Sequence, residues 1–454
     1  MKKSLILLLC LAAFAIPSLG QPRHVTIEKA KNGQWEMKVD GKPFFAQGAA
    51  FYNSQNAYCQ PANFGANTVR SFLLTLDSKA MLDRIAQAGL MVHAGLGFKS
   101  IRSGYYAQNE DKAIDEQEEL ILRRVRMFKD HPAILCWCIG NEFEIGHSGK
   151  PLTAQWESIQ RLAEQIHEID PHHPVTLSVV DGYPEAKAYA LMNICTDLDF
   201  ISCNGYVHKG ELRLIRQLDE LGWEKPFMTS ELGPEGWWLH ADLGVDRFTP
   251  WGTVVDLTST EKEPIYEDCM LSCRQDPRCI GIMTFLWGWQ TGQRDEILEW
   301  YGLINRDFYT YGAVDVMQRI WTGHEPRAKA PRIESRNDLT MDGKTVDKWL
   351  QVQPGSEHTA AVVAGNPAHV NLRYHWRIIA ERSRNWDNSL HDGIAGLIAD
   401  NGHPEIHFSA PYKPGAYRLY VHVYDDINHK AAYASFPFLV EGEAEALEDL
   451  GGRP

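Results

Sequence analysis

The feature that most restricts the fold of this chain is a regular alternation of strand-type and helix-type segments between residues 44 and 322. Short apolar runs, typical of strands buried on both faces, lie at 44–48, 67–72, 90–95, 134–139, 175–179, 199–204, 226–230 and 280–287. The intervening charged segments have apolar residues at helical spacing, and they predict helices at 77–88, 115–129, 153–169, 211–221 and 313–321. This pattern predicts a single (β/α)8 TIM barrel. A doubly wound open sheet is the alternative, but it would more often carry a Gly-rich nucleotide loop, and the chain contains no G-x-G-x-x-G or Walker pattern.

The first residues have the pattern of a targeting segment. Lys2 and Lys3 precede an apolar core, and small residues follow up to Gly20. This arrangement predicts a signal peptide at 1–20, cleaved near Gly20, and therefore a secreted or periplasmic protein. No other stretch reaches 18 apolar residues, so we expect no integral membrane span.

The remaining chain divides by its hydrophobic period. A β-hairpin is expected at 25–39, which makes 21–322 the barrel domain. Residues 323–331 are rich in Pro, Gly and charge, and we interpret them as a linker. Short β-type runs then follow without long helices, which predicts a C-terminal immunoglobulin-like β-sandwich at 332–442 and a flexible tail at 443–454.

Composition narrows the range of partners. The chain has 454 residues, 44% of them hydrophobic, which is typical of a globular protein, and a net charge of −14. This charge argues against nucleic acid or an anionic membrane as the main partner.

Three of the cysteines, Cys269, Cys273 and Cys279, lie close together in the sequence. A local disulfide between two of them is possible, whereas no nearby His completes a metal site there.

Two glutamates end predicted strands. Glu142 follows Asn141 after the fourth strand, and Glu231 follows the seventh. An isolated Asn-Glu pair more often caps a helix. In a closed barrel, however, the C-terminal ends of all strands meet at one mouth, where such barrels keep their active sites. Two carboxyl groups at the mouth could carry out glycoside hydrolysis. The distance between them would decide whether the configuration of the anomeric carbon is retained or inverted.

The run from Trp137 to Glu142, followed by Thr229-Ser230-Glu231, resembles glycoside hydrolase clan A, and is most like the catalytic barrels of families two and five. The resemblance covers about residues 40 to 322. It implies that Glu142 is the general acid/base and Glu231 the nucleophile. The long loop at 232–266 and the three-cysteine segment are not general features of the clan, and the amino-terminal sandwich of family two is missing.

The resemblance also implies roles for four further residues. It assigns Asn141 to the sugar 2-hydroxyl, Arg70 to the support of the nucleophile, Tyr206 to contact with the nucleophile, and Trp287 to the floor of the sugar subsite. Each has an alternative: Arg70 could pair with a helix acid, Tyr206 could be a rim aromatic, and Trp287 could be core.

Three polar or aromatic residues complete the candidate substrate-binding set. His93 and Asn204 lie at predicted strand ends, and Trp237 follows the seventh strand closely. His93 is as well explained as a core histidine, and Trp237 as packing for the loop.

The sequence therefore predicts a retaining β-glycoside hydrolase, with carbohydrate as its partner and no metal or organic cofactor needed for the chemistry. The leading substrate is a β-glucan, β-1,3-linked by analogy with exported barrels of this kind. Two rivals remain. One is a non-hydrolytic carbohydrate receptor on the barrel, and the other is a transglycosylase that uses the same carboxylate pair.

Overall fold

The computed structural model describes residues 22–100, 104–107, 109–145, 152–182, 184–206, 212–236, 247–290, 299–381 and 392–442. The predicted signal peptide, Trp237 and the predicted tail lie outside these residues.

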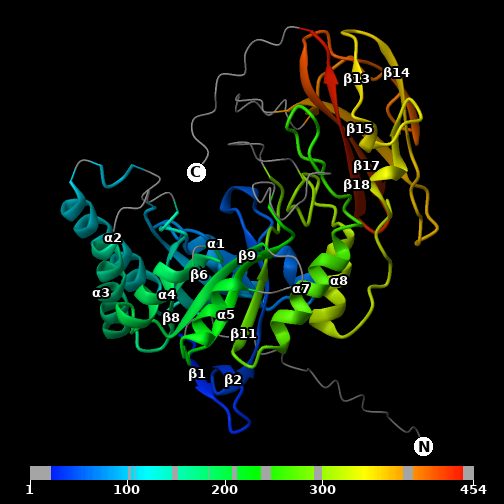
Figure 1. Ribbon diagram of the computed structural model, residues 1–454. Coiled ribbons are helices and arrows are strands. Elements are labelled where there is room, and N and C mark those ends of the chain that lie inside the picture. Colours follow the sequence, from blue (N-terminus) through cyan, green and yellow to red (C-terminus); the bar gives the residue numbers. More distant parts are fainter. Residues whose placement is uncertain are drawn as a thin grey trace, which may run out of the picture.

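Eight parallel strands close into a barrel in the order β10-β11-β4-β5-β6-β7-β8-β9 (Figure 1). The barrel predicted from the sequence is thus confirmed. Nearly every strand residue is buried, which explains why the strands are continuous apolar runs rather than alternating ones. The strands are β4 (Ala46–Phe51), β5 (Thr68–Ser71), β6 (Met91–Phe98), β7 (Ile134–Asn141), β8 (Val175–Val180), β9 (Phe200–Tyr206), β10 (Phe227–Gly233) and β11 (Cys279–Thr284).

Amphipathic helices pack around the barrel and bury their apolar stripes against its outer face. Helix α2 shows the local logic, because the Asn109 side chain caps its first turn by accepting from Lys112 N at 3.0 Å. The helices are α1 (Lys79–Gln87), α2 (Glu110–Phe128), α3 (Thr153–Ile169), α4 (Pro184–Asn193), α5 (Arg213–Glu220), α7 (Glu263–Gln275) and α8 (Gly312–Thr322).

Helix α7 was missed in the sequence. Its buried residues are Tyr266, Cys269, Met270 and Cys273, a spacing that fits one helix face. In the sequence, these cysteines were considered as candidates for a disulfide and were not counted among the apolar residues of a helix. None of the eight cysteines in the described part of the chain is in a disulfide, and both Cys269 and Cys273 pack in the barrel core.

An antiparallel sheet of β1 (Val25–Lys29), β2 (Trp35–Val39) and β3 (Lys42–Phe44) covers the lower end of the barrel in Figure 1. Its apolar residues pack against the N-terminal ends of the barrel strands. Because Lys42–Phe44 pair with this sheet, the first barrel strand begins at Ala46 and not at residue 44.

After the barrel, seven strands of the described residues form two sheets that share one hydrophobic core around Trp376. One sheet has the order β12-β14-β16, and the other has the order β13-β18-β17-β15. We call this unit the C-terminal domain. Its strands are β12 (Leu339–Met341), β13 (Gln351–Val352), β14 (Glu357–Val362), β15 (Arg373–Ala380), β16 (Glu405–Ser409), β17 (Gly415–Asp425) and β18 (Lys430–Val440), with short 3-10 turns at η5 (Arg336–Asp338) and η6 (Val346–Lys348).

The C-terminal domain is bonded to the barrel through β17 and β18. Arg418 donates to Val254 O at 2.6 Å, Tyr433 N donates to Ser259 Oγ at 3.0 Å, and Lys430 pairs with Asp315 of α8. Residues 247–262, which follow the strand that ends near Glu231, therefore lie between the barrel and this domain.

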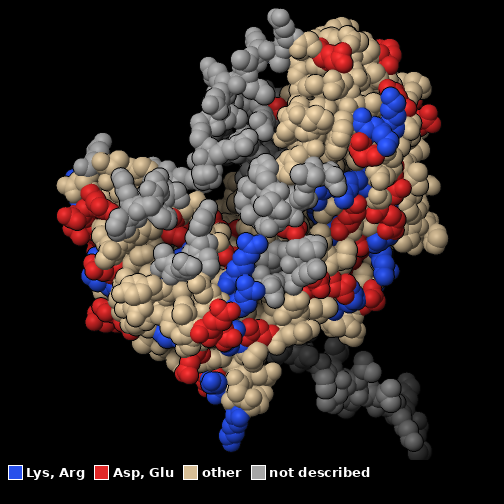
Figure 2. Space-filling view, viewed as in Figure 1, with Lys and Arg blue, Asp and Glu red and all other residues tan. Residues whose placement is uncertain are grey.

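No helix in the described part of the chain is both long and apolar enough to cross a membrane. On the face drawn in Figure 2, the described acidic and basic side chains are interspersed, and no large basic patch gathers there.

Candidate active site

Strand β7 delivers Glu142 to the mouth of the barrel. The strand ends at Asn141, and Glu142 then adopts a left-handed backbone with φ of 48°. A non-glycine residue takes this conformation uncommonly, because its side chain strains the backbone there. The amide N of Glu142 donates to Ser178 O of β8 at 2.9 Å, which fixes the turn to the neighbouring strand.

Strand β10 places Glu231 opposite a buried guanidinium. Arg70 of β5 is 1% exposed, and its Nη1 lies 2.6 Å from Glu231 Oε1. The same Nη1 donates to Ser230 O at 3.1 Å, and Nη2 donates to Asn141 Oδ1 at 2.6 Å. One rigid fork therefore holds two of the predicted site residues in register.

Asn204 of β9 joins the two carboxyl groups. Its Nδ2 donates to Glu142 Oε1 at 2.8 Å and to Glu231 Oε1 at 3.0 Å, and also reaches Asn141 Oδ1 at 3.0 Å. Because both carboxyl oxygens contact one nitrogen, they lie within about 6 Å of each other, which is short of the ~6.5–9.5 Å of inverting glycosidases. The separation fits the retaining geometry.

The two carboxyl groups have unequal surroundings. Burial, reinforced by the negative charge of Glu231, raises the pKa of Glu142 to about 8. Glu231 instead faces Arg70 and accepts a short hydrogen bond from Tyr206 OH at its other oxygen. Burial, followed by the charge of Glu231, raises the pKa of Tyr206 well above its usual range, so its hydroxyl stays a donor. At neutral pH, Glu142 thus holds a proton, whereas the neighbouring Glu231 contacts a cation and a hydroxyl.

The structure therefore brings together six of the predicted residues: Arg70, Asn141, Glu142, Asn204, Tyr206 and Glu231. Asn204 is fully buried, and its amide contacts and orients both carboxyl groups; its predicted contact with a substrate stays a prediction. Asn141 accepts through its side-chain oxygen from Arg70 Nη2 and from Asn204 Nδ2, so its NH2 group is the part of the amide that can donate to a ligand.

His93 is not at the mouth, and its predicted place at a strand end was wrong. Strand β6 continues to Phe98, five residues beyond it, so His93 lies inside the barrel with no exposed surface. Its Nε2 lies 2.9 Å from Ser202 Oγ. Burial, and then the charge of Arg70, lowers its pKa to about 3, so it is a neutral core histidine.

Trp287 does not lie where the sequence predicted it, at the floor of the sugar subsite. Its side chain is fully buried, packs on Phe64 with ring centroids 5.5 Å apart, and donates from Nε1 to Gln60 Oε1 at 3.2 Å. Strand β11 ends at Thr284, so strand alternation does not extend to Trp287. It is a core residue and not the floor of a subsite. Trp237 lies outside the described residues.

Three contributors were missed. Ser230 Oγ donates to Asn204 Oδ1 at 2.6 Å and so fixes which end of that amide faces the carboxyl groups. Phe285 and Tyr301 flank Tyr206, with ring centroids 5.8 Å and 4.8 Å away. Ser230 could have been found as the neighbour of Glu231, whereas Tyr301 comes from a loop with no strand or helix signal.

Glu144, two residues after Glu142, forms an ion pair with Lys187 at 3.0 Å and accepts from Val180 N at 3.1 Å, so its role is structural. Within the described residues, no cluster of three or more His, Cys, Asp or Glu side chains is placed to hold a metal ion.

Comparison with known proteins agrees with this geometry. Residues 81–237 match the sequence model of the TIM barrel domain of family 2 glycosyl hydrolases. No curated protein matches the chain. The resemblance to clan A is thereby confirmed for the central part of the barrel, which is of the glycoside hydrolase type.

Solved structures are similar in fold. A Bifidobacterium dentium β-glucuronidase complexed with coumarin-3-O-glucuronide aligns with TM-score 0.50 and 20% identity over 66% of this chain and 49% of its own. Bacteroides uniformis β-glucuronidase 2, covalently bound to cyclophellitol-6-carboxylate aziridine, aligns with TM-score 0.50 and 13% identity over 92% of this chain and 48% of its own. The chain thus spans about half the length of each.

Proposed function

We propose that this protein is a retaining β-glycoside hydrolase. The observation that carries the proposal is the single amide of Asn204 shared by Glu142 and Glu231, because it keeps the two carboxyl groups too close for an inverting mechanism. Glu231 attacks the anomeric carbon and forms a covalent glycosyl-enzyme, while Glu142 gives its proton to the departing oxygen. Glu142 then takes a proton from the water that releases the sugar.

The surroundings of each carboxyl group support these roles. Arg70 and Tyr206 favour a charged Glu231, as a nucleophile requires. The pKa of about 8 keeps Glu142 protonated at neutral pH, as a general acid requires. Asn141, with its oxygen engaged, presents its NH2 group to a sugar hydroxyl.

For the substrate we propose a neutral β-linked glycan, with a β-1,3-linked glucan as the first linkage to test. The charge at the site supports a neutral sugar. Arg70 is the cation described at the carboxyl pair, and its guanidinium already contacts Glu231, Ser230 and Asn141. A glucuronide, the substrate type named for the similar structures, would need a cation from elsewhere for its carboxylate.

Two further expectations stay proposals. The strand order of the C-terminal domain, with β13 parallel to β18 at one sheet edge, supports an immunoglobulin-like sandwich. Export rests on residues 1–20 alone and is checked by the N-terminal sequence of the mature protein.

The roles are tested by Glu231→Ala and Glu142→Ala. We expect Glu231→Ala to abolish turnover of aryl β-glycosides, and added azide to yield a glycosyl azide of inverted anomeric configuration. Glu142→Ala should impair substrates with poor leaving groups much more than activated aryl glycosides. Full activity of Glu231→Ala, or equal losses for both substrate types in Glu142→Ala, would contradict the assignment.

The products of the reaction distinguish a hydrolase from a non-hydrolytic receptor and from a transglycosylase. A receptor would bind the glycan and release no reducing ends, and the carboxyl pair argues against it because binding does not need two such groups. A transglycosylase would release longer glycans in place of the hydrolysed sugar. Product sizing on a panel of β-glycans and aryl β-glycosides, glucuronides included, distinguishes the three.

A further inference from the structure

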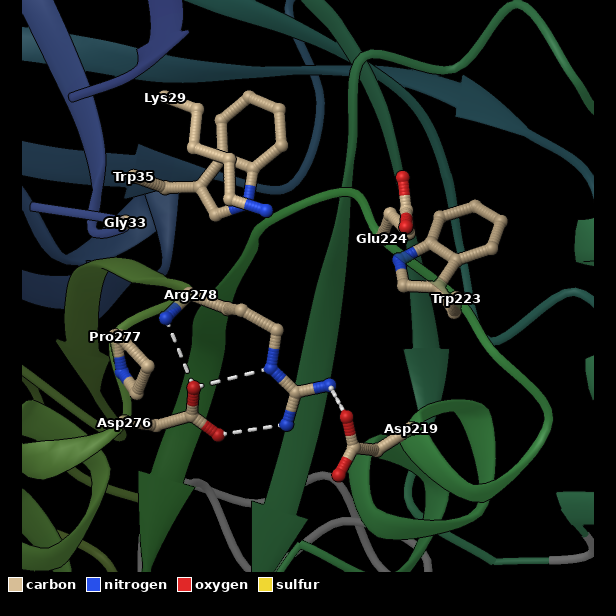
Figure 3. Close-up of a pocket in the computed structure, with 9 residues that line it drawn as sticks. All are labelled: Lys29, Gly33, Trp35, Asp219, Trp223, Glu224, Asp276, Pro277 and Arg278. Atoms are coloured by element: carbon tan, nitrogen blue, oxygen red, sulfur yellow. Dashed lines mark hydrogen bonds and ion pairs between the residues drawn. The ribbon is translucent and has the colours of Figure 1, made fainter. Parts of the chain in front are cut away.

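A cavity lies at the opposite end of the barrel from the carboxyl pair. It has a volume of about 490 Å³, within the range of small-ligand sites, and its lining includes Arg278, which directly precedes β11 (Figure 3). Trp223 comes from the turn before β10, whereas Glu231 lies near that strand's other end. At about 3.3 Å per residue, the two sites are separated by roughly the length of a strand.

The walls of this cavity are fastened to one another. Trp35 N of the N-terminal sheet donates to Pro277 O at 2.8 Å. Arg278 holds Asp276 through Nε at 3.1 Å and Nη2 at 2.9 Å, and holds Asp219 of α5 through Nη1 at 2.9 Å. Three separate segments are thereby fixed around the cavity, which lowers the ordering cost of binding a ligand there.

Two indoles, Trp35 and Trp223, stand on either side of the cavity with the Arg278 guanidinium between them (Figure 3). Each is half-buried and packs against a core cluster, so its position is set while part of its ring stays accessible. Flat aromatic faces match the apolar C–H faces of pyranose rings, and the adjacent carboxylates and guanidinium match their hydroxyl groups.

The charges favour a neutral ligand. Arg278 is already paired with two aspartates, so the lining leaves Glu224 and Lys29 as its other charged groups. The lining therefore carries three carboxylates against two cations, Arg278 and Lys29, and this negative balance disfavours an anionic sugar.

We propose that this cavity is a second saccharide-binding site that captures a neutral β-linked glycan away from the catalytic centre. The proposal rests on the proposed function for its ligand class. A polysaccharide held at both sites gains effective concentration at the active site, whereas a short substrate gains nothing.

The test uses the full chain. Glu231→Gln is run in native gels with and without soluble β-1,3-glucan, alone and combined with Trp35→Ala and Trp223→Ala. We expect the indole substitutions to weaken the gel retardation about tenfold in apparent affinity. With Glu231 intact, the same double variant should keep the parent's turnover of an aryl β-glycoside and lose activity on the polymer. Tyr412→Ala, a control aromatic that is 78% exposed, should change neither readout.

Unchanged retardation in the double variant, or equal loss with Tyr412→Ala, would overturn the proposal. Retained aryl glycosidase activity shows that the double variant is folded. If the double variant does not fold, the gel retardation is measured with Trp223→Phe, which keeps an aromatic face. The proposed function fails separately, by the absence of activity on every aryl β-glycoside.

A different set of contacts links the C-terminal domain to the nucleophile. Glu299 is 4% exposed, and its side chain accepts from Tyr311 OH at 2.7 Å and lies 3.3 Å from His422 Nε2 of β17. Its main-chain oxygen accepts from Tyr433 OH of β18 at 2.6 Å. The C-terminal domain thus contacts both the side chain and the backbone of Glu299.

The next two residues reach the catalytic centre. Trp300 Nε1 donates to Glu235 O, four residues after the nucleophile, at 3.0 Å. The Tyr301 ring packs on Tyr206, whose hydroxyl donates to Glu231. The segment 299–301 is therefore held by the C-terminal domain on one side and supports Tyr206 on the other.

We infer that Glu299 is a positioning residue that lets the C-terminal domain set the orientation of Tyr206 against the nucleophile. We expect Glu299→Gln to lower kcat about tenfold with little change in KM, because ground-state sugar contacts stay in place. If the effect passes through Tyr206, Glu299→Gln should have almost no further effect in a Tyr206→Phe background.

Additive losses in that double-mutant cycle would overturn the inference, since a purely structural role of Glu299 would act in either background. Tyr311→Phe removes one hydrogen bond to Glu299 and repeats the cycle should Glu299→Gln not fold. His358→Ala breaks an ion pair with Asp342 in the other sheet and is the matched control, expected to leave kcat unchanged.

Discussion

Glu142 should make the protein less stable as the pH rises, and its replacement by Gln should remove that loss. Burial and the charge of Glu231 raise the pKa of Glu142 from 4.5 to about 8 in the folded protein. In the unfolded chain the same carboxyl group ionises near its ordinary value. Between these two values the folded protein binds one more proton than the unfolded chain, so the free energy of unfolding falls as the pH increases.

The size of the effect follows from the shift. Below the unfolded pKa both states are protonated, and Glu142 contributes no pH dependence. Above it, the free energy of unfolding decreases by about 1.4 kcal/mol per pH unit until the folded pKa is passed, which amounts to several kcal/mol over the window as an upper value. Gln has the same shape and no charge, so Glu142→Gln should be more stable than the parent above pH 8 and similar near pH 4.5.

The assay is the melting temperature of both proteins between pH 4.5 and 8.5, in buffers of matched ionic strength. The gap between the two curves should widen steadily with pH. Glu116→Gln, an exposed helix glutamate whose side chain is 61% accessible, is the control and should run parallel to the parent. Parallel curves for Glu142→Gln and the parent would refute the view that Glu142 is buried with its proton.

Four further outcomes are expected. The kcat/KM of the parent on a substrate with a poor leaving group should fall about tenfold per pH unit above pH 8, where Glu142 loses its proton, as a pH–rate profile will show. Arg70→Met should lower the free energy of unfolding by about 3–5 kcal/mol, measured by chemical denaturation, because the charge of Glu231 is left buried without its cation. Ser230→Ala should reduce kcat without abolishing it, since it frees the Asn204 amide to rotate, and an unchanged kcat would count against that role. Trp376→Ala should cost about 3–5 kcal/mol by opening a cavity in the core of the C-terminal domain, and denaturation followed by fluorescence will measure it.

The sequence by itself determined the barrel and the two carboxyl groups. Strands buried on both faces leave continuous apolar runs, and a residue that ends such a run must emerge at the mouth. Glu142 and Glu231 were found in this way, whereas Arg70 and Tyr206 were assigned by the resemblance of the sequence to clan A.

Only the tertiary structure decided what lies beyond those runs. His93 looked like a strand end until β6 proved longer, and Trp287 looked like a sugar platform until its strand ended before it. The helix α7 was hidden by cysteines that pack as apolar residues. The local sequence pattern shows whether a segment is a strand or a helix. It does not show where that strand or helix ends, or in which direction a side chain beyond its end points.

The unequal surroundings of the two carboxyl groups also came from tertiary structure. The donors to Glu231 arise from β5 and β9, far apart in the sequence, and the Asn204 amide that joins it to Glu142 is oriented by Ser230. Which carboxyl group holds the proton depends on burial and on neighbours contributed by several strands at once. The sequence therefore placed both glutamates at the mouth of the barrel, and the closed barrel made them different from each other.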